Sequence, residues 1–143
     1  MIGTGRTVLV VEDEPANQRL FRDLLSRDGY TVLITGDGSE AVGLAQERKP
    51  DLILMDIGLP GISGLDATRT IRQNAATAAI PIVALSAYAM KEDREEAMGA
   101  GCDAFVAKPF NIAELLGVVR SHLGEGGRRA AEGNVDENGG TNG

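Results

Sequence analysis

Residues 8–13 read VLVVED, so four aliphatic residues run directly into two acidic ones. A short apolar run without polar alternation is typical of a strand that is buried on both faces, as in a parallel sheet. Similar apolar runs later in the chain end on Asp56, Ser86 and Lys108. The carboxyl ends of parallel strands meet at one edge of an open sheet, where ligands bind. We therefore expect these polar side chains to meet at that edge.

Helical patterns fill the segments between the apolar runs. After the first run, Pro15 suits the first turn of a helix and Gly29 suits its end. Five residues between them are expected to form one buried stripe: Ala16, Leu20, Phe21, Leu24 and Leu25. Farther on, the charged residues 91–96 indicate a solvated helix face, and Asn111 is suited to cap a last helix.

Strand-like and helix-like segments alternate from residue 7 to about residue 123. The strands are expected at residues 7–11, 31–34, 52–55, 82–85 and 103–107. Such alternation implies a parallel sheet with right-handed crossovers and helices on both faces. We predict an α/β fold, a doubly wound five-stranded parallel sheet in the order 2-1-3-4-5 with five helices, which is flavodoxin-like. This order places the first and third strands side by side, so Glu12, Asp13 and Asp56 converge.

Composition and charge limit the classes of function. The chain has 143 residues, 43% of them hydrophobic, which suits one globular domain. We expect this domain at residues 7–123, with a disordered N-terminus at 1–6 and a disordered, glycine-rich acidic tail at 124–143. The net charge of −7 argues against nucleic-acid binding, and no apolar run approaches the roughly 20 residues that span a bilayer. The start also lacks a secretory signal, so we expect a cytoplasmic protein without membrane partners.

The residues at the predicted edge suit phosphoryl transfer. Three convergent carboxylates repel one another unless a cation is present, and oxygen ligands on loops favour Mg²⁺. Two of the acids can hold the metal, which leaves Asp56, alone after its strand, as the nucleophile. Attack by its carboxylate on a phosphoryl donor gives an aspartyl phosphate. Lys108 and the Ser86 hydroxyl are placed to stabilise the charge on the phosphoryl oxygens.

This pattern resembles the receiver domain of two-component response regulators, which is CheY-like, over residues 7–123. The motif residues that carry the resemblance are Glu12-Asp13, Asp56, Ser86 and Lys108-Pro109. The resemblance implies that Asp56 is phosphorylated by a sensor histidine kinase or a histidine phosphotransfer protein. It implies Mg²⁺ ligands at the two acids after the first strand, at Asp56 and at the Gly58 backbone carbonyl. It also implies that the hydroxyl and the lysine bind the phosphoryl group.

Further positions take roles from the same resemblance. Phe105 corresponds to an aromatic switch residue three positions before the lysine, and without a tyrosine hydroxyl it must act by packing alone. The Lys108–Pro109 bond is a candidate for the rarer cis isomer. Gly58 and Tyr88 occupy two positions that vary in the family and influence the lifetime of the phosphoryl group. Their expected effects oppose each other, so the lifetime itself is not predicted.

Within the family, the chain is most similar to stand-alone regulators of the DivK cell-cycle type. The segments that carry this narrower similarity are 49–57 (KPDLILMDI), 89–91 (AMK) and 101–102 (GC). It implies a stoichiometric phosphoacceptor, not an enzyme, that promotes its own phosphorylation and dephosphorylation. We expect it to signal to a downstream protein target through the face of the fourth helix, fifth strand and fifth helix. A relay shuttle, an allosteric effector of a kinase and a phosphate sink have identical sites, so all three remain open.

Two other classes of protein share parts of the pattern. Haloacid-dehalogenase-type phosphatases need a second aspartate two residues after the nucleophile, where this chain has Gly58. Flavin-binding modules on the same fold need a Ser/Thr-rich phosphate loop after the first strand, and none follows here. Taken alone, Asp56 suits a turn and Lys108 an ordinary surface charge. Only the joint placement of the motif residues favours the response regulator.

Overall fold

The computed structural model describes residues 5–58 and 63–123. Five strands in these ranges form one parallel sheet in the order β2-β1-β3-β4-β5. The strands are β1 (Thr7–Val11), β2 (Thr31–Thr35), β3 (Leu52–Asp56), β4 (Ile82–Ser86) and β5 (Ala104–Ala107). The helices are α1 (Pro15–Arg27), α2 (Gly38–Arg48), α3 (Gly64–Gln73), α4 (Lys91–Ala100) and α5 (Ile112–Leu123). None of these helices combines the length and apolar composition that crossing a membrane requires.

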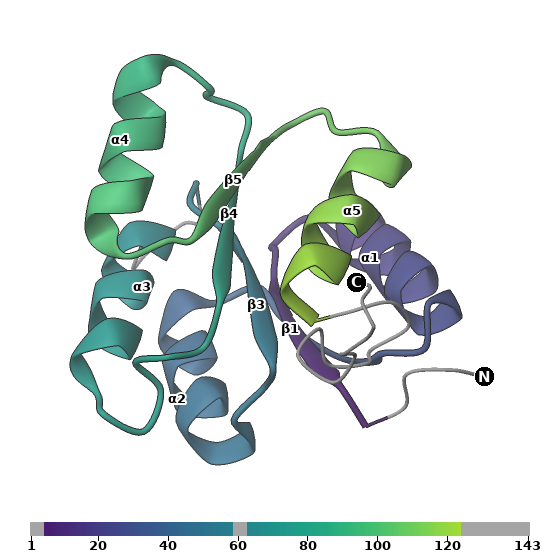
Figure 1. The fold of residues 1–143 in the computed structure, drawn as a ribbon, viewed down its shortest axis with the longest axis horizontal. Coiled ribbons are helices and arrows are strands. Elements are labelled where there is room, and N and C mark those ends of the chain that lie inside the picture. The colour runs from purple at the N-terminus through teal and green to yellow at the C-terminus, as the bar shows by residue number, and fades with distance from the viewer. Residues whose placement is uncertain (1–4, 59–62, 124–143) are drawn as a thin grey trace, which may run out of the picture.

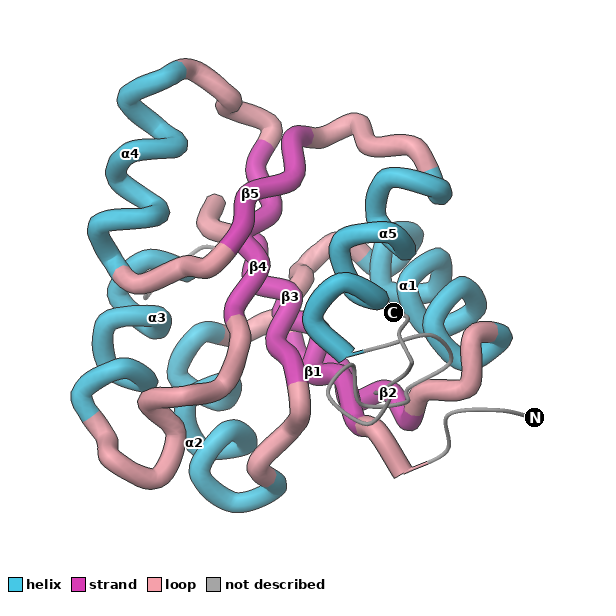
Figure 2. Tube along the Cα trace, in the orientation of Figure 1, coloured by secondary structure: helices cyan, strands magenta, loops and turns pink. Residues whose placement is uncertain are grey.

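The sheet lies between two layers of helices, with α1 and α5 on one face and α2, α3 and α4 on the other (Figures 1 and 2). Each face has its own core, because successive residues of a strand point to opposite sides. The core under α1 and α5 includes Val8, Val10, Phe21, Leu54 and Leu115. The core under the other three helices includes Leu9, Val11, Ile53, Met55 and Ile71. The predicted class of fold and the predicted strand order are confirmed.

The register of the central strands aligns their carboxyl ends. Val11 of β1 pairs with Met55 of β3. The next residues along these two strands, Glu12 and Asp56, therefore leave the sheet side by side. Ser86 ends β4, which neighbours β3 on its other side, and every residue of β3 and β4 is buried. The edge predicted from the sequence is thus formed by the ends of adjacent central strands.

Side chains at the helix starts explain where two of the helices begin. Asp37 caps α2, because its Oδ1 accepts hydrogen bonds from the backbone N–H groups of Ser39 at 2.7 Å and Glu40 at 3.3 Å. Asn111 caps α5, as predicted, and its Oδ1 accepts from the Glu114 N–H at 2.6 Å. Both caps satisfy amides that have no partner inside their own helix. Residues directly before each helix therefore determine where α2 and α5 begin.

The buried stripe predicted for α1 is partly wrong. Phe21, Leu24 and Leu25 are buried, but Ala16 is exposed and Leu20 keeps 37% of its surface exposed. The reason is helical geometry, since a step of four residues advances about 40° beyond one full turn. The two steps from Ala16 to Leu24 add up to about 80°, so Ala16 points away from the sheet when Leu24 faces it. Residues at this spacing therefore share a face only over a short distance.

Arg6, which lies just before the expected start of the domain at residue 7, contacts the sheet. Arg6 is only 8% exposed, and its Nη1 lies 3.3 Å from Asp51 Oδ1. The other oxygen of Asp51 accepts a hydrogen bond from the Thr7 N–H at 2.7 Å. These contacts tie the start of β1 to the start of β3. The expected disorder over residues 1–4 and 124–143 lies outside the described residues.

Candidate functional site

Three carboxylates meet where β1 and β3 end. Glu12, Asp13 and Asp56 each offer a ligand oxygen, and these oxygens all lie within 4.8 Å of one another. Glu12 has no exposed surface and Asp56 keeps 7%, whereas Asp13 is exposed. Hard oxygen donors this close together suit a small divalent cation such as Mg²⁺, because uncompensated like charges repel. The predicted acidic cluster is therefore present at the sheet edge.

Backbone amides orient two of these carboxylates. The Gly58 N–H donates to Asp56 Oδ1 at 2.9 Å, and the Glu14 N–H donates to Glu12 Oε2 at 3.1 Å. Each donor lies two residues after its acceptor, so the turn that follows each strand holds the carboxylate in place. The second oxygen of each group is thereby directed toward a different partner.

Lys108 is the partner of both second oxygens. Its Nζ lies 2.9 Å from Glu12 Oε1 and 3.0 Å from Asp56 Oδ2. Burial lowers the pKa of Lys108, but its hydrogen bonds and charge attraction to the two carboxylates outweigh burial and raise the pKa above the ordinary 10.5. Lys108 therefore carries a full positive charge at neutral pH. The peptide bond between Lys108 and Pro109 is cis.

Ser86 lies at the same edge and is only 4% exposed. Its Oγ accepts a hydrogen bond from the Tyr88 N–H at 3.0 Å. The Lys108 backbone N–H donates to the Ser86 carbonyl oxygen at 2.7 Å, which joins the ends of β4 and β5. Within the described residues, the Ser86 hydroxyl itself forms no hydrogen bond with the three carboxylates or with the Lys108 ammonium. The Tyr88 side chain keeps 73% of its surface exposed. Ser86 is therefore where the sequence predicts it, but the partner of its hydroxyl in this structure is its own loop.

Phe105 lies on the face of the sheet that α2, α3 and α4 cover, and it packs against that core. Its neighbour across the strands is Ala84 of β4. The guanidinium carbon of Arg94, on α4, lies 4.7 Å from the centre of the Phe105 ring. The sequence analysis did not identify Arg94 as a site residue, because a run of charged residues predicts a solvated helix face.

Gly64, the first residue of α3, is a second position that the sequence analysis missed. A Cβ at Gly64 would lie 2.4 Å from the Asp56 carbonyl oxygen and 2.6 Å from Ile57 Cα. Both are backbone atoms, so rotation of a side chain cannot relieve the contact. The missing side chain lets α3 begin directly against the strand end that carries Asp56. Its only sequence signal is the Ser-Gly pair at residues 63–64, which is too common to indicate such a contact.

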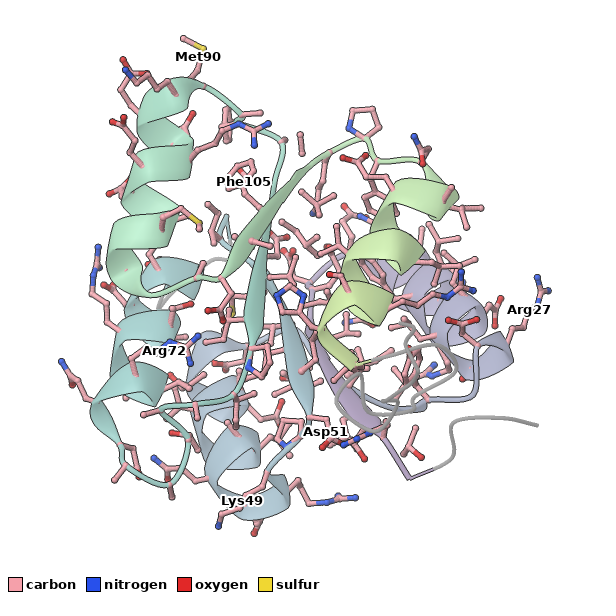
Figure 3. All side chains as sticks on the ribbon, viewed as in Figure 1. Arg27, Lys49, Asp51, Arg72, Met90 and Phe105 are labelled. Carbon is pink, nitrogen blue, oxygen red and sulfur yellow. The ribbon has the colours of Figure 1, made fainter. Side chains whose placement is uncertain are left out.

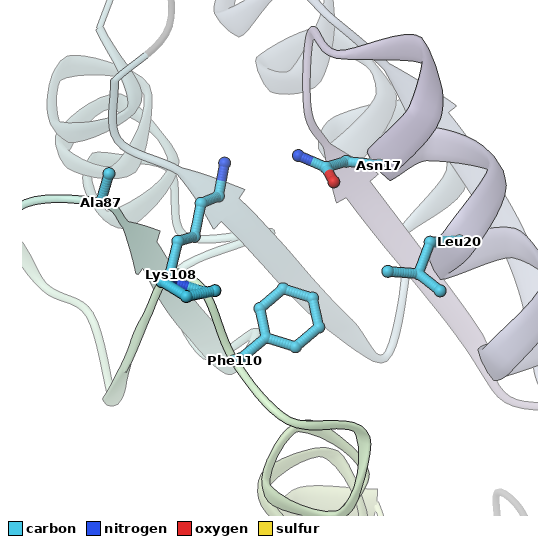
Figure 4. Close-up of a pocket in the computed structure, with 6 residues that line it drawn as sticks. Asn17, Leu20, Ala87, Lys108 and Phe110 are labelled. Carbon is cyan, nitrogen blue, oxygen red and sulfur yellow. The ribbon is translucent and has the colours of Figure 1, made fainter.

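A cavity of about 320 Å³ opens beside Lys108 (Figure 4). It is bordered by α1 and by the residues that follow β4 and β5. Its lining residues are Asn17, Leu20, Ala87, Lys108, Pro109 and Phe110. The Phe110 ring stacks on Phe21 of the core with 5.4 Å between centroids. Leu20, which the sequence placed in the core, thus contributes to an apolar wall next to the ammonium group.

A doubly wound sheet with an acidic cluster and a lysine at the ends of its central strands defines a class of signalling domain. Residues 8–120 match the family model of the response regulator receiver domain, and the chain belongs to this family. It is similar to the polar-differentiation response regulator DivK of Brucella anthropi and to that of Brucella ovis. Each is 42% identical over 120 residues, which cover 84% of this chain and 98% of the relative.

Solved structures show the same fold. One is the receiver domain of a sensor histidine kinase from Pseudomonas aeruginosa PAO1, crystallised with a magnesium ion coordinated in its active site cleft. It has a TM-score of 0.79 and 40% identity, and the match covers 85% of this chain and 100% of that one. The chemotaxis protein CheY4 of Vibrio cholerae has a TM-score of 0.78 and 28% identity, with 82% and 98% covered. The predicted family and its similarity to DivK are confirmed.

Proposed function

We propose that Asp56 of this response regulator accepts a phosphoryl group from a phosphohistidine in a Mg²⁺-dependent reaction. One observation carries the proposal more than any other. Asp56 Oδ2 lies 3.0 Å from Lys108 Nζ, at an edge where two further carboxylates come within 4.8 Å. Of the three acids, Asp56 is the one that ends the central strand β3. The neighbouring strand β4 ends at Ser86, whose hydroxyl is the other predicted phosphoryl ligand.

The reaction is a phosphoryl transfer between two nucleophiles. An oxygen of the Asp56 carboxylate bonds to phosphorus, and the bond from phosphorus to the donor nitrogen breaks, so the imidazole leaves with the electron pair. Charge spreads over the phosphoryl oxygens in the transition state, so positioned cations and donors supply most of the catalysis. Lys108 is such a cation. The Ser86 hydroxyl accepts from the Tyr88 amide, so its own proton is available to a phosphoryl oxygen.

The donor set at the edge fits Mg²⁺, which prefers carboxylate and carbonyl oxygens. We propose Glu12, Asp13, Asp56 and the Gly58 backbone carbonyl as its protein ligands, the last on the family resemblance alone. When bound, Mg²⁺ supplies positive charge that offsets the mutual repulsion of the carboxylates and of an incoming phosphoryl group. Lys108 already bonds to Glu12 and Asp56, so a single ammonium faces three carboxylates until a metal ion binds.

The proposed donor is a sensor histidine kinase or a histidine phosphotransfer protein. The cavity beside Lys108 offers a donor protein an apolar surface next to the lysine that bonds to Asp56. Leu20 on α1 and Phe110 after β5 face this cavity (Figure 4). Partly exposed apolar residues at a rim of charged groups are typical of protein contact surfaces.

Phosphorylation is proposed to switch the face of α4, β5 and α5 toward a downstream protein. The new group adds a charge of about −1.5 to −2, which draws Ser86 and Lys108 toward it. Phe105 then moves into the space that Ser86 leaves. A change from about 1:99 to 99:1 between two conformations requires roughly 5.5 kcal/mol of differential stabilisation. Large exposed apolar side chains available for contact around this face are Tyr88, Met90, Met98 and Ile112.

In this proposal the protein is a stoichiometric phosphoacceptor that promotes its own phosphorylation and dephosphorylation. Gly58 stands where a haloacid-dehalogenase-type phosphatase needs an aspartate, so no general acid is available there for a leaving group. Gly58 and Tyr88 influence the lifetime of the acyl phosphate. We place this function in the cytoplasm and assign it to residues 7–123.

The proposal is tested by incubation with acetyl phosphate and Mg²⁺. Wild-type protein is expected to gain one phosphoryl group in an adduct that is stable in acid and labile in base. Asp56→Ala is expected to gain none, because no other acid has the same two partners. Removal of Mg²⁺ with EDTA is expected to reduce labelling of the wild type strongly. Intact-protein mass spectrometry measures each result.

Asp23→Ala serves as the control, since Asp23 is an exposed acid on α1 outside the cluster. It should be labelled like the wild type. An adduct that persists in Asp56→Ala contradicts the assignment of the phosphoacceptor. Sustained turnover of p-nitrophenyl phosphate by the wild type contradicts the stoichiometric role.

A further inference from the structure

Arg94 is the one cation that the structure places over an aromatic ring in the described part of the chain. Its guanidinium carbon lies 4.7 Å from the centre of the Phe105 ring. Cations within about 6 Å of a ring centre are attracted by the negative charge of the ring face. Phe105 lies between α4 and the sheet (Figure 3). Arg94 therefore links the surface helix α4 to the side chain of β5 beneath it.

The main contact of the Arg94 guanidinium is the ring of Phe105. Within the described residues, no carboxylate lies within ion-pair distance of the Arg94 guanidinium, although the helix is rich in acids. Lys91, on the same helix, does have such a partner in Glu95 at 3.9 Å. Phe105 is half-buried, so its ring packs against the core on one side and meets α4 on the other.

We propose that Arg94 is a positioning residue that holds Phe105 in its unphosphorylated position. This inference rests on the proposed function, in which Phe105 moves toward the place of Ser86 when Asp56 is phosphorylated. Arg94 is attached to α4 and its guanidinium lies over the present position of the ring, so movement of Phe105 toward Ser86 separates the two groups. Arg94 thereby opposes the switch and sets the fraction of molecules that occupy the switched conformation before phosphorylation.

The size of the effect follows from the exposure of the contact. A cation over a ring at an exposed site changes an equilibrium by about two- to fivefold. Removing the charge should therefore raise the population of a minor switched conformation by that factor. Lys108 already lies 3.0 Å from Asp56, so the group that the switch brings in is the Ser86 hydroxyl. Small phosphoryl donors react faster with molecules whose Ser86 hydroxyl already faces Asp56. The initial rate of phosphorylation should rise by the same two- to fivefold.

The experiment uses Arg94→Met, which keeps the length and apolar stem of the side chain but removes its charge. Lys91→Met is the matched control, because it removes the same charge from the same helix. Arg94→Lys retains a cation and should return most of the way to wild type. The double variant Arg94→Met/Phe105→Leu, compared with Phe105→Leu alone, isolates the pair, since coupled residues give non-additive effects. Initial labelling rates with acetyl phosphate and Mg²⁺ are measured for all of them.

A second measurement does not depend on phosphorylation. The chain has three phenylalanines, so incorporation of 4-fluorophenylalanine gives few ¹⁹F signals, and the Phe105→Leu variant assigns the one from Phe105. That signal should move in Arg94→Met and stay in place in Lys91→Met. The signals of Phe21 and Phe110, which stack on each other at 5.4 Å, serve as internal references.

The expected result is a faster rate in Arg94→Met that disappears in the Phe105→Leu background, together with the shifted ¹⁹F signal. The inference is overturned by a rate equal to wild type, by an equal increase in Lys91→Met, or by an increase that persists without Phe105. An unmoved Phe105 signal overturns it as well. If wild-type protein takes no phosphoryl group at all, the proposed function fails, and the ¹⁹F spectra alone decide whether Arg94 positions the ring.

Discussion

The three carboxylates at the sheet edge differ in their partners, and the partners separate their roles. Glu12 is fully buried and bonds to Lys108, whereas Asp13 is exposed and reaches the cluster from outside. Asp56 has one oxygen held by the Gly58 amide and the other by Lys108. The proposed nucleophile is therefore held at both oxygens before any donor arrives, which favours reaction in a near-attack geometry.

Gly64 keeps that orientation intact, and Gly64→Ala is expected to disturb it. A Cβ there would lie 2.4 Å from the Asp56 carbonyl oxygen, so the strand end or α3 must shift. Overpacking of this kind destabilises by about 1–3 kcal/mol. Displacement of a reacting group slows its reaction, here by about tenfold or more. Urea unfolding and acetyl phosphate labelling, the latter well below the melting temperature, measure the two effects.

Gly43→Ala is the control for this prediction. A Cβ at Gly43, within α2, meets no atom within 4 Å, so this substitution should stabilise the helix by about 0.5–1 kcal/mol. Its labelling rate should equal that of wild type. An undiminished rate in Gly64→Ala would show that the close approach of α3 does not position Asp56.

Arg72, on α3 (Figure 3), connects several elements near the points where β4 and β5 begin. Its guanidinium donates to Gly101 O (2.8 Å), Ala78 O (2.9 Å), Ile80 O (2.6 Å) and Asp103 Oδ2 (2.8 Å). The acceptors belong to the connection before β4 and to the turn between α4 and β5. One side chain of α3 thus satisfies carbonyl groups of two connections that have no sheet or helix partner for them.

Arg72→Met is therefore expected to lower the free energy of unfolding by about 2–4 kcal/mol, because it leaves several acceptors without their charged donor. Arg69→Met is the comparison, since Arg69 forms an exposed pair with Asp66 one turn away. Such a pair contributes about 0–1 kcal/mol. Chemical denaturation measures both variants. Equal losses in the two would mean that Arg72 acts only as another surface charge.

For the whole molecule, the repulsion among the carboxylates at the acidic edge lowers the free energy of unfolding. The oxygens of three carboxylates lie within 4.8 Å of one another, and Lys108 is the one cation among the described residues that pairs with them, bonding to Glu12 and Asp56 but not to Asp13. The net charge of −7 adds to the unfavourable potential there. The residues proposed to bind a cation and a phosphoryl group therefore repel one another when neither is bound, which lowers the stability of the fold.

Asp13→Asn is expected to raise the melting temperature in EDTA by a few degrees, because it removes one of the repelling charges. Saturating Mg²⁺ should raise the melting temperature of the wild type, since a ligand that binds only the folded state stabilises it. The rise should be much smaller in Asp13→Asn. Thermal unfolding with and without Mg²⁺ measures all four values. Asp23→Asn, outside the cluster, should show the full response to Mg²⁺, and a full response in Asp13→Asn would remove Asp13 from the proposed ligands.

The strand order and the positions of Glu12, Asp13, Asp56, Ser86 and Lys108 were all predictable from the sequence. Apolar runs and the residues that end them are local features, and a parallel sheet converts their order into a common edge. The helix caps at Asp37 and Asn111 are local as well. The buried stripe of α1 was predicted only in part, because periodicity indicates a face and not how far the sheet extends beneath it.

Other features depend on the packing of segments that are distant in the chain. These features are the bridge from Lys108 to two acids, the close approach of Gly64 to Asp56, the Arg72 contacts and the stacking of Arg94 on Phe105. Each arises where two or more elements pack with a particular spacing and angle. Residue type alone permits many partners for a lysine, a glycine or an arginine. The folded chain selects one of them, since distance and burial exist only once the elements are assembled.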